Sequence, residues 1–367
     1  MTEHIVVIGA GVYGATVTAA LVRRGARVTV VDSGAPATGT SGASFAWTNS
    51  NGKQPPAYHD LNVAGMEAHR RLVRDIRGGG DWYHEGGNLE WAAGEAERAA
   101  LTRKVDSLLR SGYEARWLSR DQVLRLEPDL DPAAVPACEI AYFPREGWIE
   151  PTRLIGRLLS VAGADRVWHD AVTGIDVSGG VVRAVRLASG RRLPADAVVD
   201  CAGPRAAEVA ALAGLRLPMS NTRGVLVYTS PVAVAVSCVV HAPHVHLRPD
   251  GAGRLLLHRH DIDDAAQVSA TGAITVDQTA VDELMETGVA LYPGVRAAHV
   301  ESARVGVRPI PGDGLPVLGR ASALPNFHFA VSHSGATLCV HAGALVAAEV
   351  LGEDHSAELA AFRFERF

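Results

Sequence analysis

The chain has 367 residues, 47% of them hydrophobic, which is enough for two co-folded domains that each bury a core. Its 35 Lys and Arg against 40 Asp and Glu give a formal net charge of -5, and no block of like charges marks an arm that binds nucleic acid. Four widely separated cysteines with no CxxC pair argue against a zinc site or a disulfide scaffold, and they favour a reduced, cytoplasmic compartment.

The first predicted elements form a β-α-β unit. Residues 5–8 are a continuous apolar run, typical of a strand buried on both faces of a parallel sheet. Residues 12–24 carry apolar side chains at helical spacing and stop at Gly25, and residues 27–31 form a second β-branched run. The few residues before this unit lack the features of a signal peptide. The unit predicts a Rossmann-like α/β domain with a parallel sheet.

A glycine motif lies between the first strand and the first helix. In this G-x-G-x-x-G pattern, Gly9 permits the tight turn, Gly11 lets a pyrophosphate approach the backbone, and Gly14 allows close packing of helix on strand. Asp32 ends the second strand, where its carboxylate can accept hydrogen bonds from ribose hydroxyls. The motif predicts a dinucleotide. The acid disfavours the 2′-phosphate of NADP and leaves FAD and NAD open.

A polar loop follows the ribose acid. Residues 39–44 read Gly-Thr-Ser-Gly-Ala-Ser, and these small side chains and hydroxyls suit a path along a pyrophosphate and a flavin edge. The alternative is a flexible polar loop without a ligand. Lys53 comes shortly afterwards. A solvated surface lysine is one interpretation of this residue.

Two inserts predict a second domain over the cofactor. Residues 81–143 are rich in Trp, Glu and Arg with amphipathic helical spacing, and residues 224–260 alternate like strands around a Pro-Asp-Gly turn. Strand signals return at residues 197–201 and 327–331, each followed by glycine and an alanine-rich stretch. The nucleotide-binding domain is therefore expected to be discontinuous. Its expected segments are 1–80, 148–218 and 305–367, with a β-rich substrate domain at 81–147 and 219–304.

Four histidines surround the turn between the predicted hairpin strands. His244 and His246 are two residues apart, as are His258 and His260, so each pair is expected to share one face of a strand. A four-histidine metal cluster is geometrically possible, but no carboxylate helper is evident and no metal site is expected. The favoured interpretation is a hairpin lining the substrate pocket. His246, His258 and His260 would then face that pocket, and an imidazole can accept a proton near neutral pH.

Motifs in the last third of the chain indicate a family. They are Val-Gly-Val-Arg-Pro at 305–309, Gly-Asp-Gly-Leu-Pro-Val-Leu-Gly at 312–319 and Phe-Ala-Val-Ser-His-Ser-Gly at 329–335. Together with the N-terminal unit and Asp-Cys-Ala-Gly-Pro at 200–204, they resemble the D-amino-acid oxidase, glycine oxidase and sarcosine oxidase family of FAD enzymes. The resemblance covers roughly half of the chain. It implies FAD, held non-covalently because no cysteine stands between Arg304 and Leu338, where some relatives carry a flavin link.

The resemblance also places the flavin near a C-terminal helix, predicted at residues 340–351. The N-H groups and dipole of this helix would stabilise negative charge at the pyrimidine end of the flavin. Its apolar stretch is too short to span a bilayer, and no transmembrane segment is expected. The expected cofactor contacts are Gly9, Gly11, Val12, Gly14, Asp32, Ser33, Thr40, Ser41, Ala43, Ser44, Val172, Ala202, Gly203, Arg308, Ser334, Gly335, Ala336, Thr337 and Leu338.

Arg308 matches the arginine with which amino-acid-oxidising relatives grip the substrate carboxylate. An interdomain ion pair is the alternative role. The expected activity is FAD-dependent oxidation of a small amine or amino acid, with a hydride equivalent passing from the carbon next to a neutral amine to flavin N5. The resemblance implies that His246 is a substrate contact or proton acceptor, because relatives carry an aromatic near that position, with His258 or His260 serving similarly. It also suggests that Lys53, held near flavin N5, would polarise oxygen or a bound water, as a lysine from another part of the chain does in sarcosine-oxidising relatives. The catalytic candidates are Arg308, His246, Lys53 and His258.

Two other functions stay open at this point. The first is an FAD-binding electron-transfer subunit of a larger dehydrogenase, and the second is a flavin hydroxylase. The exact substrate, the electron acceptor and the oligomeric state do not follow from these motifs, because pocket shape decides such choices. The expected partner is a small molecule, rather than nucleic acid or a membrane.

Overall fold

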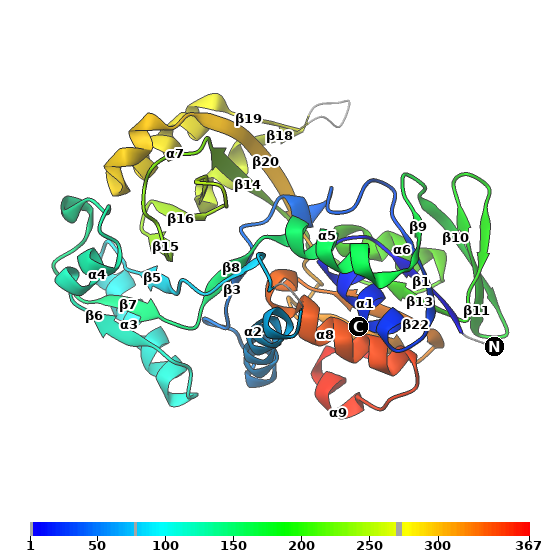
Figure 1. Cartoon of the computed structure of the whole chain (residues 1–367). Coiled ribbons are helices and arrows are strands. Elements are labelled where there is room, and N and C mark those ends of the chain that lie inside the picture. Colours follow the sequence, from blue (N-terminus) through cyan, green and yellow to red (C-terminus); the bar gives the residue numbers. More distant parts are fainter. Residues whose placement is uncertain (1–2, 77–78, 269–273) are drawn as a thin grey trace.

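Two sheets organise the computed structural model, which describes residues 3–76, 79–268 and 274–367 (Figure 1). One sheet has six strands and the other has eight. In Figure 1 the two chain termini and the blue, green and red segments lie on the right, whereas the cyan and yellow segments lie together on the left. Segments far apart in the sequence therefore build the same half of the molecule.

The six-stranded sheet is a parallel sheet with one antiparallel edge strand. Its order is β21-β22-β13-β1-β2-β9, and only β21 pairs antiparallel with its neighbour. The strands are β1 His4–Ile8, β2 Arg27–Val31, β9 Asp165–Val167, β13 Ala197–Asp200, β21 Val317–Ala321 and β22 Leu324–Val331. The four strands expected at 5–8, 27–31, 197–201 and 327–331 are confirmed, and all four lie in this sheet. The α/β class and the Rossmann-like arrangement are thus confirmed.

Helices around this sheet bury its apolar face. Helix α1 (Val12–Arg23) packs against α5 (Pro151–Ala162) and α8 (Gly335–Val350), and α2 (Pro56–Asp75) packs against α8. The short helices α6 (Ala206–Leu212) and α9 (Ser356–Leu359) complete this half. Helix α8 begins five residues before the predicted start at 340, because the Ser334 carbonyl already accepts the N-H groups of Thr337 and Leu338.

The eight-stranded sheet is antiparallel except for one pair. Its order is β20-β14-β17-β16-β15-β5-β7-β6, and only β15 and β5 run parallel. The strands are β5 Asn88–Glu90, β6 Arg116–Leu118, β7 Ile140–Phe143, β14 Thr222–Thr229, β15 Val239–Ala242, β16 Val245–Pro249, β17 Leu255–His258 and β20 Val300–Arg308. The expected hairpin around the Pro-Asp-Gly turn is confirmed as β16 and β17.

The insert at 81–143 is less helical than its spacing indicated. It holds α3 (Glu95–Arg110) and α4 (Arg120–Leu126), but it also contributes β5, β6 and β7 to the eight-stranded sheet. These strands are only three or four residues long, too short for a period of two to stand out in the sequence. Helix α7 (Gln278–Leu291) packs against β16 and β17.

Smaller sheets complete the fold. They are β3 Trp47–Thr48 with β8 Gly147–Ile149 and β4 Tyr83–His84, then β10 Val172–Ser178 with β11 Val181–Leu187 and β12 Arg192–Pro194, and finally β18 Ala266–Val268 with β19 Ile274–Val276. All four cysteines are free. Within the described residues, no helix combines the length and the apolar character that a membrane crossing requires.

We keep the division into two domains as a proposal, and the membership of the two large sheets supports it. The six-stranded sheet takes its strands from residues 4–8, 27–31, 165–200 and 317–331, and the eight-stranded sheet takes its strands from 88–143 and 222–308. Strand β20 runs through the expected boundary at residue 305. The strand therefore joins the two proposed domains directly.

Candidate active site

The glycines of the turn after β1 have two different roles. Two of them are required by the packing of the fold, and one leaves space that a ligand would use. Gly9 has φ +104°, and a Cβ there would lie 2.4 Å from the Cys201 carbonyl oxygen. A Cβ on Gly14 would lie 1.8 Å from the Gly9 carbonyl oxygen, as expected for close packing of helix on strand. A Cβ on Gly11 would meet only Ser41 Oγ, at 3.0 Å. The bare backbone at Gly11 thus keeps room beside the start of α1.

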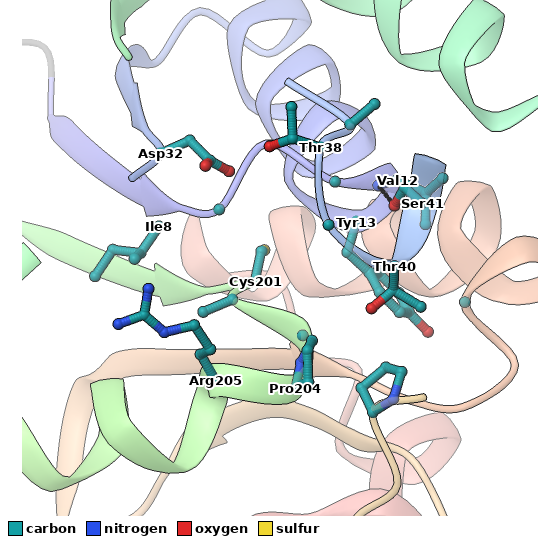
Figure 2. A pocket seen from close by; sticks show the side chains of 18 of the residues that line it. Ile8, Val12, Tyr13, Asp32, Thr38, Thr40, Ser41, Cys201, Pro204 and Arg205 are labelled. Carbon is teal, nitrogen blue, oxygen red and sulfur yellow. Dashed lines mark hydrogen bonds between the residues drawn. The ribbon is translucent and has the colours of Figure 1, made fainter. Parts of the chain in front are cut away.

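A cavity of about 350 Å³ opens at this turn, outside the carboxyl ends of β1, β2 and β13 (Figure 2). This edge of a parallel sheet is where nucleotides bind in such folds. Of the expected cofactor contacts, those that line it are Gly9, Gly11, Val12, Asp32, Ser33, Thr40, Ser41, Ser44, Val172, Ala202, Gly203, Gly335 and Ala336. Residues from six separate segments of the chain therefore line one cavity.

The Asp32 carboxylate is fixed by backbone donors. Its Oδ2 accepts from the Ala10 N-H at 2.7 Å and its Oδ1 accepts from the Gly34 N-H at 2.8 Å. Each carboxylate oxygen can accept more than one hydrogen bond, so capacity for ribose hydroxyls remains. The two backbone contacts set the orientation in which the carboxylate faces the cavity.

The first turn of α1 offers N-H groups to an anion. The Val12 N-H donates to Ser41 Oγ at 3.1 Å, and this contact is visible in Figure 2. Early N-H groups of a helix have no partner inside the helix, and they bind phosphate well. A pyrophosphate at this point would compete with the Ser41 hydroxyl for the Val12 N-H. The cavity therefore fits the central part of a dinucleotide.

The sequence analysis missed Arg205 in this cavity. Figure 2 shows Asp32 and Arg205 at the same end of the cavity, on opposite walls. Arg205 pairs with Glu208 at 2.9 Å, and its Nη1 lies 3.4 Å from Ser33 Oγ. The available signal was its place directly after the Asp-Cys-Ala-Gly-Pro motif. A cation at this wall offsets negative charge on a bound nucleotide.

A second cavity, of about 770 Å³, adjoins the first. The two cavities share Thr40, Ser44, Pro309, His333 and Ala336. The residues that line the second from the sets expected above are Ala43, Ser334, Thr337, Arg308, Lys53, His246, His258 and His260. The junction between the cavities lies at the beginning of α8, where the flavin was expected to meet the helix.

Two expected cofactor contacts line neither cavity. Leu338 is fully buried in the core that α1 and α8 share, and its N-H is already bonded to the Ser334 carbonyl. The earlier start of α8 turns this side chain inward, so its expected contact is not supported. Gly14 lies behind the glycine turn and supports it through packing, which is the role the motif assigned to it.

Arg308 lines the second cavity and also forms an ion pair. Its Nη1 lies 2.8 Å from Asp263 Oδ2 and contacts the Arg223 carbonyl oxygen. The guanidinium lies over Gly224, where a Cβ would come within 2.6 Å of Nη2. Asp263 in turn accepts from the Val225 N-H at 2.7 Å. The ion pair considered for Arg308 is thus present, and Asp263 fixes the plane of the guanidinium at the cavity wall. The carboxylate role of Arg308 stays a prediction.

Lys53 faces the second cavity instead of bulk solvent. Its Nζ lies 5.8 Å from the centroid of the Tyr58 ring, and burial lowers the pKa of this lysine. His333 lines the same wall. Burial, together with the charges of Lys53 and Arg308, lowers the pKa of His333 to about 4. Lys53, Lys104 and Arg308 line this cavity beside Glu90 and Glu97, and Lys104 pairs with Glu90 at 2.6 Å. Lys53 and Arg308 can therefore each offer a positive charge to an anionic group on a ligand.

The structure corrects the expected histidine cluster. His244 is exposed on the turn between β15 and β16 and lines neither cavity, whereas His241 on β15 does line the second. The two-residue turn pairs His241 directly with His246, so locating that turn would have found it. Burial lowers the pKa of His246 to about 3. The imidazole is then a poor proton acceptor near neutral pH, and a substrate contact is the role that remains.

Glu146, which lies behind this cavity, makes the stability of the protein depend on pH. It is fully buried and accepts from Trp47 Nε1 at 2.9 Å and from Tyr113 Oη at 2.7 Å. Burial raises its pKa from 4.5 to about 8. Between these values the folded chain binds a proton that the unfolded chain has lost, so this group lowers the free energy of unfolding as pH rises.

Replacing Glu146 by Gln is therefore expected to raise the melting temperature relative to the wild type more at about pH 9 than at about pH 5. Thermal unfolding of both proteins across this pH range measures the effect. The exposed Glu95→Gln variant serves as the control and should follow the wild-type profile. A constant offset between Glu146→Gln and wild type at every pH would contradict the prediction.

Comparisons with known proteins agree with this geometry. The family model described as DAO, FAD dependent oxidoreductase, matches residues 4–349. Glycine oxidase of Bacillus licheniformis is 25% identical over 98% of this chain and 96% of that protein. Glycine oxidase of Geobacillus kaustophilus (strain HTA426) is 26% identical over 99% and 96%. The crystal structure of glycine oxidase from Geobacillus kaustophilus superposes with a TM-score of 0.85, at 25% identity over 100% of both chains.

Proposed function

The chain belongs to the DAO family of FAD-dependent oxidoreductases, and on that premise we propose that it oxidises a small amine that carries a carboxylate. The observation that carries this proposal is the junction of the two cavities. A cavity at the sheet edge, lined by the glycine turn and Asp32, meets a second cavity that contains Arg308 and Lys53 at the beginning of α8. The glycine oxidases among the relatives support an amino acid as the substrate class. They also favour amine oxidation over an electron-transfer subunit or a hydroxylase.

The residues of the first cavity would hold FAD. The α1 terminus and Arg205 would face its phosphates, and Asp32 would accept from a ribose. The start of α8 at Gly335 would direct N-H groups and a partial positive charge to the flavin end. When bound, FAD supplies the acceptor for the hydride equivalent that leaves the carbon next to the amine.

The residues of the second cavity would orient the substrate. Arg308 would bind the carboxylate, with Asp263 as the positioning residue that holds the guanidinium plane. His246 and His258 would contact the substrate. Because the lowered pKa keeps the His246 imidazole neutral, this side chain would place no positive charge beside the amine. Lys53 would hold oxygen or a water molecule beside the flavin. Alignment of the substrate by these residues would then promote the reaction without a general base.

Product analysis with matched substrates tests this proposal. FAD-loaded protein would be incubated with glycine, sarcosine and iminodiacetate. Each would be compared with the corresponding amine in which hydrogen replaces every carboxylate. Carbonyl products from the carboxylated members, with little from their counterparts, are the expected result. Equal turnover of both members of each pair would contradict a carboxylate requirement.

A cytoplasmic location is proposed as well, and the four free cysteines support it.

A further inference from the structure

We propose that His246, His258 and His260 form a binding site for a divalent d-block cation in the wall of the second cavity. The three residues each offer a ring nitrogen within 4.8 Å of the others. In a zinc site with bonds of 2.0–2.1 Å, ligand nitrogens stand roughly 3.3 Å apart, so modest ring rotations would close the set. His260 is exposed at the first residue of the 3₁₀ helix His260–Ala265, where its side chain has room for such a movement.

The sheet register brings the three rings together. His246 on β16 stands directly opposite His258 on β17, so their side chains share one face. His260 follows two residues later on the same face, while Arg259 between them pairs with Asp261. The ring centroids lie 5.7 Å apart for His246 and His258, and 5.2 Å from His260 to each of the others. The sheet register therefore brings His246 and His258 together, and the ring distances place His260, in the 3₁₀ helix that follows, beside both.

The surroundings of His258 prepare it as a ligand. Its Nδ1 lies 3.0 Å from the Val225 carbonyl oxygen, and because a carbonyl only accepts, Nδ1 carries the proton. Asp263 Oδ1 lies 3.8 Å from the same nitrogen. Nε2 is then left with its lone pair, which is the usual arrangement of a metal-binding histidine whose other nitrogen donates to a carbonyl or carboxylate. The helper that the sequence analysis did not find is thus supplied from β14 and the 3₁₀ helix.

The neighbouring imidazoles complete the setting. Within the ranges that the structure describes, the His246 ring has no hydrogen-bond partner, so both its nitrogens are available. His241 stands 4.5 Å from His246 between ring centroids, and its Nδ1 lies 2.7 Å from Asn88 Oδ1. Three ligands leave a fourth position open to the cavity, where Arg308 and Lys53 also lie.

An all-imidazole donor set selects the class of ion. Neutral imidazole suits zinc, copper(II) and nickel, whereas calcium and magnesium require oxygen ligands. Asp263, whose Oδ1 lies 3.8 Å from His258 Nδ1, supplies negative charge beside the ion, and the open position would take a carboxylate oxygen. This inference goes beyond the proposed oxidation, because the three histidines would bind the ion whether or not an amine is oxidised.

Equilibrium dialysis tests the site directly. FAD-loaded protein, freed of any affinity tag, would be dialysed against Zn²⁺, Ni²⁺ or Cu²⁺ salts without substrate, and bound metal would be quantified by elemental analysis. One equivalent is expected for wild type. His246→Ala, His258→Ala and His260→Ala are each expected to weaken binding by at least about tenfold. The exposed His260 is the substitution least able to disturb folding.

His244→Ala is the matched control on the same hairpin and should bind as the wild type does. Flavin content and melting temperature, measured for every variant, separate loss of the site from loss of the fold. Binding of less than one equivalent at saturation, or equal weakening by His244→Ala and His260→Ala, would overturn the proposal. Calcium binding at the same site would also overturn it.

Discussion

Replacing Arg308 by Met is expected to lower kcat/KM for carboxylated amines by at least about tenfold, and by far less for amines without a carboxylate. The variant removes the planar donor fork at the cavity wall and leaves Asp263 without its ion-pair partner. The interaction lost with the substrate is the pair that Arg308 would form with its carboxylate, and truncating one partner of a buried, hydrogen-bonded charge pair costs roughly 2–5 kcal/mol, which makes tenfold a lower bound. Initial rates over a range of substrate concentrations, with both kinds of amine, measure the effect.

Two variants on the same strand sharpen this test. Arg308→Lys keeps the charge but loses the fork, and an intermediate rate is expected from it. Arg304→Met removes an arginine that lies over the Tyr228 ring and lines neither cavity. That control should keep near wild-type kinetics. If Arg308→Met slowed both kinds of amine equally, Arg308 would be a structural residue of the ion pair and not the carboxylate contact.

Gly11→Ala is expected to weaken FAD binding by roughly tenfold to a hundredfold while the protein stays folded. The added methyl group would meet only Ser41 Oγ, at 3.0 Å, in the protein itself. It would, however, occupy the space through which a pyrophosphate approaches the first turn of α1, and such overpacking costs about 1–3 kcal/mol. Titration of the apoprotein with FAD, followed by the change in flavin fluorescence, gives the dissociation constants.

Gly156→Ala is the matched control, because a Cβ at that position of α5 meets nothing within 4 Å. It should bind FAD as tightly as the wild type. Gly9 and Gly14 are unsuitable for this comparison, since a Cβ at either would collide with backbone oxygen atoms and disturb the fold. Unchanged FAD affinity in a folded Gly11→Ala variant would show that the nucleotide does not approach this turn.

Local signals explain what the sequence could predict. The β-α-β unit, its glycine turn and Asp32 depend on residues close together in the chain, and each was found where the structure has it. The hairpin of β16 and β17 was found for the same reason, since the Pro-Asp-Gly turn lies between two alternating runs. The short strands of the insert at 81–143 were missed because they are defined by their partners in the sheet.

Long-range contacts explain what the sequence could not predict. Asp263 lies 45 positions before Arg308, and nothing local marks it as the residue that holds the guanidinium. His244 was included in place of His241 because the position of the tight turn decides which histidine faces the cavity. Arg205 reaches the nucleotide cavity from the far wall, and only the packing of β13 beside β1 brings it there.

Anaerobic titration of the pure, FAD-loaded protein with carboxylated amines tests the central claim most directly. The account predicts that one of these amines removes the absorbance of oxidised flavin in proportion to the amount added, and that a carbonyl product appears in equal amount. A folded protein that takes up no FAD, or a bound flavin that every carboxylated amine leaves oxidised, would contradict it.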